Sequence, residues 1–158
     1  GGLFRCSFSN AKCQFYKSFK SIFSKVGCSA SEEVILSLIR AKCLPCLLYG
    51  VEACPFFKRD KHSFDFSMTR IFMKILKTGS SAVVVECQKQ FNFLPLKFQV
   101  DIRTANFMTQ FMSTDNFVCT LFVSQASRNL NNIFSTYGAS VRSMRDLKTA
   151  VYGAAFNL

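Results

Sequence analysis

Residues 29–79 read SASEEVILSLIRAKCLPCLLYGVEACPFFKRDKHSFDFSMTRIFMKILKTG, and this stretch decides the fold of the chain. Apolar residues recur every three or four positions in both of its halves, which predicts two long amphipathic helices. Pro45 lacks an amide hydrogen, so we expect the first helix to kink near Ala41. A tight corner at Tyr49 and Gly50 should end this helix, because Gly50 can take a positive φ angle.

The ends of these two helices carry capping signals. We expect a capping box between Ser29 and Glu32 at the start of the first helix, where the Glu32 and Glu33 carboxylates also complement the helix dipole. Pro55 separates the helices, Asp60 is the expected N-cap of the second, and Gly79 should close it. The second helix has one long apolar stripe: Phe64, Met68, Ile71, Phe72, Ile75 and Leu76.

The rest of the chain also has a helical pattern. A helix from about Asn10 to Val26 should stop at Gly27, and Gly1–Phe8 is expected to form a short strand or an extended arm. Further expected helices are one through Gln88 capped by Ser80 or Ser81, Leu96–Met112 after Pro95, a pair within Asn116–Tyr137, and one from Ser140 to Val151 or beyond. The prediction is an all-α helical bundle of about six to seven helices. Its two small lobes would be a thumb-like lobe, 1–79, and a smaller connection lobe, 80–158.

The chain is strongly basic, with a formal net charge of +11. Residues 1–79 hold 13 Lys and Arg against 5 Asp and Glu, and residues 80–158 hold 7 against 4. Such a field favours polyanions, of which nucleic acid is the most common. A solvated lysine surface and a ribosomal or membrane-surface contact are the alternatives. A nucleic-acid partner should contact the first half more.

The eight cysteines lie mostly on helical stripes, which favours reduced thiols in a cytoplasmic or nuclear protein. Cys43, Cys46, Cys54 and His62 contain the residue types of a zinc site, but their spacing fits no compact zinc knuckle. We interpret Cys43 and Cys46 as small core residues and His62 as a surface residue. No metal site, no cofactor, no signal peptide and no membrane span are expected.

Motifs for catalysis are not apparent. The sequence has no GxxxxGK[ST] or GxGxxG loop, and no Asp-Asp pair follows an apolar strand, as two-metal polymerase chemistry would require. Adjacent Glu32 and Glu33 point apart on a helix and cannot act as paired carboxylates. We therefore expect that this chain is not an enzyme by itself.

The basic helix faces are the candidate binding residues. Arg70, Lys74 and Lys77 are four and three residues apart and should share one exposed face, which could follow a phosphate backbone. The full predicted set is Arg70, Lys74, Lys77, Lys58, Arg59, Lys61, Lys17 and Lys20. The alternative is that these residues only solvate amphipathic helices.

From Cys13 to about Leu96 the chain resembles the region after the palm in the reverse transcriptases of LINE-type (non-LTR) retrotransposons. Four segments carry the resemblance: NAKCQFYKSFKSIFSKVG, SEEVILSLIRAKCLPCLLYGVEAC, DFSMTRIFMKILKTGSS and ECQKQFNFLPL. The Leu-Leu-Tyr-Gly-x-Glu block at Leu47–Glu52 is the most specific, since it resembles the usual end of the long thumb helix in that family. The tail to Leu158 resembles the family more loosely.

The resemblance implies a helical thumb and connection that hold a template–primer duplex, with Arg70, Lys74 and Lys77 facing the backbone. The fingers, the palm with its metal-binding aspartates and an endonuclease domain have no counterpart in these residues. Phe56 and Phe57 replace a pair expected to be smaller and more polar. These departures fit a truncated or decayed copy of such an element.

Two main hypotheses follow. The first is a non-catalytic, thumb-like fragment that binds an RNA–DNA or RNA duplex, together with the missing palm or another protein. The second is a structural or interaction protein, a domesticated or decayed fragment that docks in a larger assembly through a Phe-rich apolar face. A cationic secreted polypeptide with four disulfides is a third possibility, which the helical placement of the cysteines disfavours.

Overall fold

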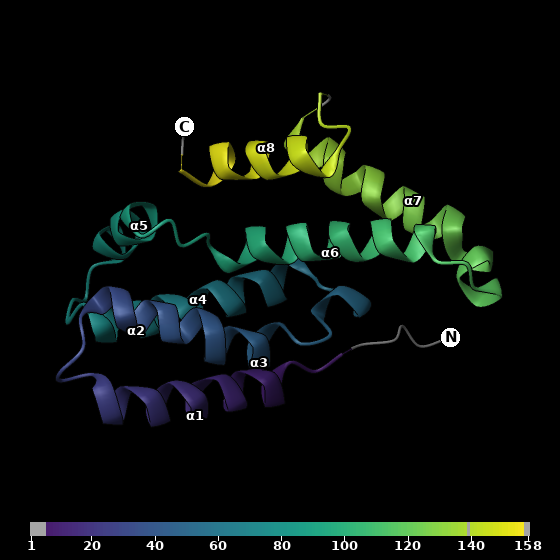
Figure 1. Cartoon of the computed structure of the whole chain (residues 1–158). Coiled ribbons are helices and arrows are strands. Elements are labelled where there is room, and N and C mark those ends of the chain that lie inside the picture. Colours follow the sequence, from purple (N-terminus) through teal and green to yellow (C-terminus); the bar gives the residue numbers. More distant parts are fainter. Residues whose placement is uncertain (1–5, 139, 157–158) are drawn as a thin grey trace. The chain divides into compact units, whose positions relative to one another are not determined.

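The computed structural model describes residues 6–138 and 140–156, and within these ranges the chain is all-α, as predicted. The helices are α1 (Ser9–Val26), α2 (Glu32–Leu38), α3 (Leu44–Leu48), α4 (Lys58–Ile75), α5 (Ser81–Gln90), α6 (Leu96–Ser113), α7 (Phe117–Tyr137) and α8 (Met144–Phe156) (Figure 1). A π turn, Ile39–Cys43, joins α2 to α3, and a short 3-10 helix, Val51–Ala53, follows α3. The first five residues of the predicted N-terminal strand or arm lie outside the described residues.

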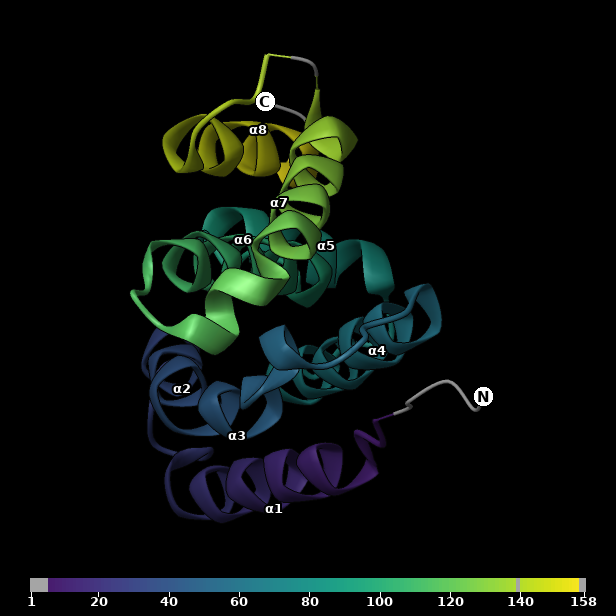
Figure 2. The same ribbon diagram turned by 90° about the vertical axis from the view of Figure 1, so that its right-hand side faces the viewer.

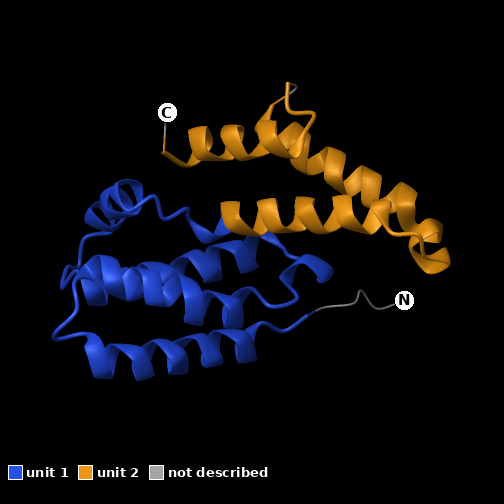
Figure 3. Ribbon diagram, viewed as in Figure 1, with its two compact units in different colours: residues 1–97 blue, residues 98–158 orange. Residues whose placement is uncertain are grey.

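The helices form two compact units, residues 1–97 and 98–158 (Figure 3). The division lies further along the chain than the 79/80 boundary that we predicted from the sequence, so α5 belongs to the first unit. Two contacts hold it there. The Arg40 guanidinium donates to the carbonyl oxygens of Phe91 and Asn92 at 2.7 and 2.8 Å, and the Phe93 ring packs edge-on against Phe72 of α4.

The π turn shapes the centre of unit 1. In an unbroken α-helix Pro45 would leave the Ala41 carbonyl without its amide partner. Here the amide of Leu44 instead donates to the carbonyl of Ile39, five residues back, which fits one extra residue into the turn. The departure from α-helical geometry that we expected near Ala41 is therefore confirmed in position, and its form is a π turn.

The extra residue keeps the apolar face aligned. It rotates the following helix by about 100° relative to an unbroken α-helix. Without that rotation Leu44 and Leu48 would turn away from the face that holds Ile35 and Ile39. With it, the whole run is buried: Ile35, Leu36, Ile39, Cys43, Leu44, Leu47 and Leu48. This buried face packs against α1 in unit 1 (Figures 1 and 2).

By length and composition alone, Glu32–Ala53 would be long enough and apolar enough to cross a membrane. The core helix of a soluble protein can have the same composition. Of the 18-residue apolar stretch within Glu32–Ala53, 44% is buried inside the structure. No membrane span was expected from the sequence, where Arg40 and Lys42 interrupt this stretch, so that it is apolar on average but not continuously.

The caps of three helices differ from the sequence predictions. Ser31, not Ser29, caps α2 by accepting from the Val34 amide at 3.5 Å, because the chain makes a further turn after α1. Asp60 lies in the first turn of α4 and accepts from the Phe57 amide at 3.2 Å, so Phe57 occupies the N-cap position. At α8 the capping residue is Ser143, which exchanges bonds with Asp146, and not Ser140.

Other predicted boundaries match more closely. Gly50 has a φ angle of 68°, so the Tyr-Gly corner after α3 is confirmed.

The predicted pair of helices within Asn116–Tyr137 is a single helix, α7, capped by Asn116 and ended at Gly138 with a φ angle of 132°. The prediction of two helices is therefore wrong: no glycine or proline lies within α7, and the helix continues unbroken to Tyr137.

Unit 2 is held by a small core and one strong polar contact. Its buried residues are Val100, Ala105, Ala126, Leu130, Val141, Leu147, Val151 and Phe156. The Tyr137 hydroxyl at the end of α7 donates to an Asp101 carboxylate oxygen of α6 at 2.6 Å. Burial and this carboxylate raise the pKa of the Tyr137 hydroxyl well above its usual range. The contact therefore holds a neutral phenol against a carboxylate.

We expect Arg40→Met to lower the free energy of unfolding by about 1–2 kcal/mol, since it leaves the two carbonyls at the end of α5 without their charged donor. Lys42→Met is the matched control, because Lys42 is an exposed cation on the same π turn. It should change stability by less than about 0.5 kcal/mol. Urea unfolding followed by circular dichroism measures both, and equal effects would contradict the role given to Arg40.

We expect Tyr137→Phe to cost about 1–3 kcal/mol, because it removes a hydrogen bond to a carboxylate. The raised pKa also predicts a pH dependence. The stabilisation is complete below the pKa of about 10 that an unfolded tyrosine has, and it is lost as the pH rises beyond that value. The difference in unfolding free energy between wild type and Tyr137→Phe should therefore be smaller at pH 10.5 than at pH 8. An equal difference at the two pH values would contradict this account.

Candidate nucleic-acid interface

Helices α1 and α4 of unit 1 pack parallel and in register. The Lys12 ammonium of α1 donates to the Ser63 hydroxyl of α4 at 2.9 Å, and the Lys74 ammonium of α4 lies 5.5 Å from the ring centroid of Phe23 in α1. Both contacts join positions 51 residues apart, so the two helices advance together from one contact to the next. At 1.5 Å per residue this pairing extends over about 17 Å.

One face of α4 is buried and the other carries cations. The buried residues Phe64, Met68, Ile71, Phe72 and Ile75 confirm most of the predicted apolar stripe. On the exposed side Arg59, Phe66, Arg70 and Lys74 are seven, four and four residues apart, which places them in one row. Phe66 is 62% exposed, and the Arg70 guanidinium lies 5.8 Å from its ring centroid.

The edge of α1 beside α4 also combines cations with aromatic rings. Lys12, Tyr16, Lys20 and Phe23 are four, four and three residues apart, and therefore lie along one edge of the helix. The contacts of Lys12 and Phe23 with α4 show that this edge is the one beside α4. We call the combined surface the α1–α4 basic surface and define it as Lys12, Tyr16, Lys20, Phe66, Arg70 and Lys74.

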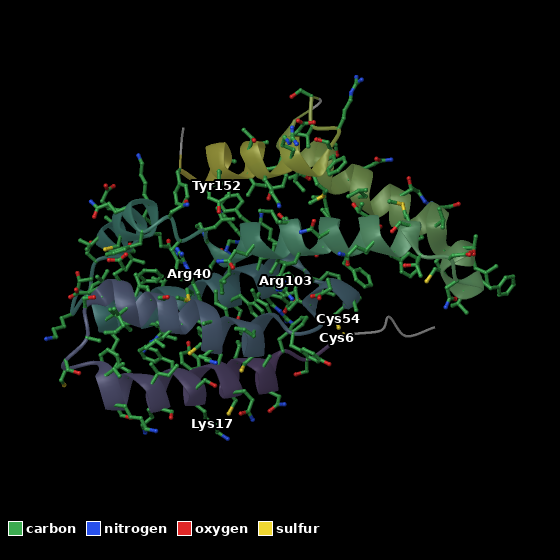
Figure 4. All side chains as sticks on the ribbon, viewed as in Figure 1. Cys6, Lys17, Arg40, Cys54, Arg103 and Tyr152 are labelled. Carbon is green, nitrogen blue, oxygen red and sulfur yellow. The ribbon has the colours of Figure 1, made fainter. Side chains whose placement is uncertain are left out.

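The structure brings only some of the predicted binding residues together. Lys20, Arg70 and Lys74 belong to the α1–α4 basic surface, and Arg59 extends the row on α4. Lys17 lies on the outer side of α1 and points away from the other helices of unit 1 (Figure 4). Lys17 and Lys20 are both exposed on α1, but only Lys20 lies on the edge that adjoins α4.

Lys77 lies beyond the end of the helix that carries the other two cations of its predicted row. Helix α4 ends at Ile75, and Lys77 follows the end of the helix with a φ angle of 51°. The Thr78 amide donates to the Met73 carbonyl at 3.0 Å, which is the closing bond of a Schellman motif. The single face predicted for Arg70, Lys74 and Lys77 is therefore wrong at Lys77, because the helix stops before Gly79 at a non-glycine residue.

The three cations at the start of α4 differ in exposure. Lys58 and Arg59 are exposed, whereas Lys61 is half-buried and lies three residues before the buried Phe64. Cations in the first turn oppose the positive end of the helix dipole. Asp60 lies in the same first turn, and its carboxylate offsets part of this repulsion.

The cysteines and His62 do not assemble into a metal site. Within the described residues no three His, Cys, Asp or Glu side chains come together. Cys43 is fully buried, and burial raises the pKa of its thiol to about 11, which fits the predicted core role. Cys46 is exposed, so the same prediction is wrong for this residue. His62 is exposed, as predicted.

All eight cysteines are free thiols in the structure. Cys6, just before α1, and Cys54, after α3, lie next to each other (Figure 4). A hydrogen bond with Cys6, together with burial, raises the pKa of the Cys54 thiol to about 11. Cys54 is thus held as a neutral thiol near physiological pH.

The comparisons with known proteins leave the resemblance without independent support. No family model matches the chain, and neither the curated proteins nor the solved structures contain a match. The function must therefore be argued from the surface itself.

Sequence reasoning missed Lys12, Tyr16 and Phe66 as members of the surface. Phe66 could have been found, because it is the one phenylalanine of α4 that lies off the buried stripe. Tyr16 lies four residues before Lys20, and its 37% exposure places it at the edge of the buried face that holds Phe15 and Phe19. Lys12 could not have been found, since its place depends on the register between α1 and α4.

We expect iodoacetamide at pH 7.5 to modify the exposed Cys13, Cys28 and Cys46 at least tenfold faster than Cys43 and Cys54. The raised pKa of each slow thiol lowers its reactive thiolate fraction, and Cys43 is also buried. Peptide mass mapping after timed labelling measures the rates. Cys6→Ala should speed labelling at Cys54 alone, and fast labelling of Cys54 in the wild type would contradict the paired arrangement.

Proposed function

We propose that this chain is a non-catalytic nucleic-acid-binding module that contacts the phosphate backbone through the α1–α4 basic surface. The in-register pairing of α1 with α4 carries the proposal, because it lines up cations from two distant segments along one surface. A pairing length of about 17 Å is long enough for the surface to contact more than one phosphate of a strand. The excess of basic residues in positions 1–79 supports the same partner.

The partner that we propose is an RNA–DNA or RNA duplex of the template–primer type. This part of the proposal rests on the resemblance to the thumb of LINE-type reverse transcriptases. In that reading the chain is a fragment that would act with a catalytic palm or another protein, in the cytoplasm or the nucleus. Buried apolar residues on α1, α2 and α4 hold these helices together, as a rigid duplex-binding unit requires.

A different observation favours the interaction-protein alternative. The first turns of α7 expose the large apolar side chains of Phe117, Val118, Leu121 and Phe122, with exposed fractions of 56–78%. Within unit 2 a shallow apolar cavity of about 130 Å³ lies beside them, lined by Phe107, Phe111 and Phe122 among others. Exposed apolar groups next to such a hollow are typical of protein-docking surfaces.

Salt-dependent binding tests the proposed function. Fluorescence anisotropy with a labelled RNA–DNA duplex should give an affinity that falls steeply with salt, as the release of counterions requires. Arg70→Gln with Lys74→Gln should reduce the slope of log K against log salt by about 2, or about 1 for each phosphate contact. It should also weaken binding by about tenfold or more at low salt.

The control double variant is Lys17→Gln with Lys148→Gln. It removes the same net charge from exposed positions outside the α1–α4 basic surface. We expect its slope to stay within about 0.5 of the wild-type value, since neither residue would contact a phosphate. Equal slopes for the two double variants would show that only net charge matters, and would contradict a role for Arg70 and Lys74 in particular. Binding that does not depend on salt would favour the interaction-protein alternative.

A further inference from the structure

Phe66 stands out on the α1–α4 basic surface because it is a large apolar ring placed where α4 faces solvent. It is 62% exposed, while the other phenylalanines of α4, Phe64 and Phe72, are at most 1% exposed. An exposed helix position normally carries a polar residue, and the core of unit 1 does not require this ring. Its exposure therefore needs an explanation outside the packing of the unit.

The neighbours of Phe66 on its helix row are cations. Arg70 follows one turn later, with its guanidinium 5.8 Å from the ring centroid, and Lys74 and Arg59 continue the row. An apolar protein surface would have to desolvate these charges to reach the ring, which disfavours it as the occupant. A ligand that is both anionic and aromatic satisfies the ring and the cations together. Nucleotides have this chemistry.

We propose that Phe66 is a stacking platform for an unpaired base, so that the α1–α4 basic surface prefers single-stranded nucleic acid, or a duplex with an unpaired tail, over a blunt duplex. This inference rests on the proposed function and names the form of nucleic acid. Bases inside a blunt duplex are stacked on one another and offer no free face. An unpaired base offers its face to the ring, and the phosphates on either side of it can reach Arg70 and Lys74.

The exposed ring of Tyr16 fits the same arrangement. It is 37% exposed on the edge of α1 that adjoins α4, between the turns that hold Lys12 and Lys20. A chain of nucleotides that crosses the surface would thus meet an aromatic ring and flanking cations on each helix. This alternation of aromatic and basic side chains is typical of surfaces that bind single strands without sequence preference.

The experiment compares Phe66→Leu, Phe66→Tyr and Phe117→Leu by anisotropy at fixed salt. The three probes are a 12-nucleotide RNA, a blunt 12-base-pair RNA–DNA duplex and the same duplex with an unpaired 3′ tail. Phe66→Leu keeps an apolar side chain and the charge but removes the ring. We expect it to weaken binding of the single strand and the tailed duplex by about 5- to 100-fold and that of the blunt duplex by less than about twofold.

The other two variants are controls. Phe66→Tyr retains a ring and should stay within about twofold of the wild type on every probe. Phe117→Leu removes the most exposed ring of unit 2, at 78% exposure, and should change none of the affinities. The fluorescence of a 2-aminopurine base in the tail should be quenched by the wild type and not by Phe66→Leu. This quenching reports stacking of the base directly.

The outcomes separate this inference from the proposed function. An equal loss on blunt and tailed duplexes, or no loss on either, would overturn the stacking role of Phe66. In both cases the effect of Arg70→Gln with Lys74→Gln on the salt slope could still stand. If the wild type itself binds none of the probes in a salt-dependent manner, the proposed function fails and the inference fails with it.

Discussion

The π turn at Ile39–Cys43 is the constraint on which unit 1 depends. Pro45 removes one backbone donor, and a simple kink would have left the apolar residues on its two sides facing in different directions. The extra residue in the turn restores a continuous buried face, against which α1 packs, and the same turn carries Arg40, which holds the end of α5. The turn that accommodates the missing N–H group of Pro45 is thus in contact with α1, α2, α3 and the end of α5.

The sequence allowed the helices of this chain to be predicted better than the contacts between them. Helical periodicity found α1 and α6 nearly to their ends and α4 nearly to its start, because each has a clear apolar stripe or a strong boundary residue. The ends failed where several polar residues compete: Ser29 and Ser31 are equally good caps, and only the length of the preceding turn decides between them. Lys77 and Asn92 take positive φ angles without glycine, so nothing in the residue type of Lys77 marked the end of α4.

The candidate surface was predictable in part for a related reason. Spacing along one helix grouped Arg70 with Lys74 correctly, since both lie within α4. Spacing could not show which edge of α1 adjoins α4, and that edge decides between Lys17 and Lys12. The exposure of Phe66 is a property of the folded unit, although its position off the buried stripe was present in the sequence. Relations between helices therefore account for most of what sequence reasoning missed.

The parallel pairing of α1 and α4 has a consequence for how the surface arises. Two helices that run in the same direction cannot be joined by a tight turn, so α2, the π turn and α3 must bring the chain back to the starting end before α4 begins. The cations of the two helices are far apart in the unfolded chain, and they become neighbours only when α2, the π turn and α3 have folded. A peptide of α4 alone would carry half of the surface, and recruitment of a polyanion would favour the folded unit over any of its parts.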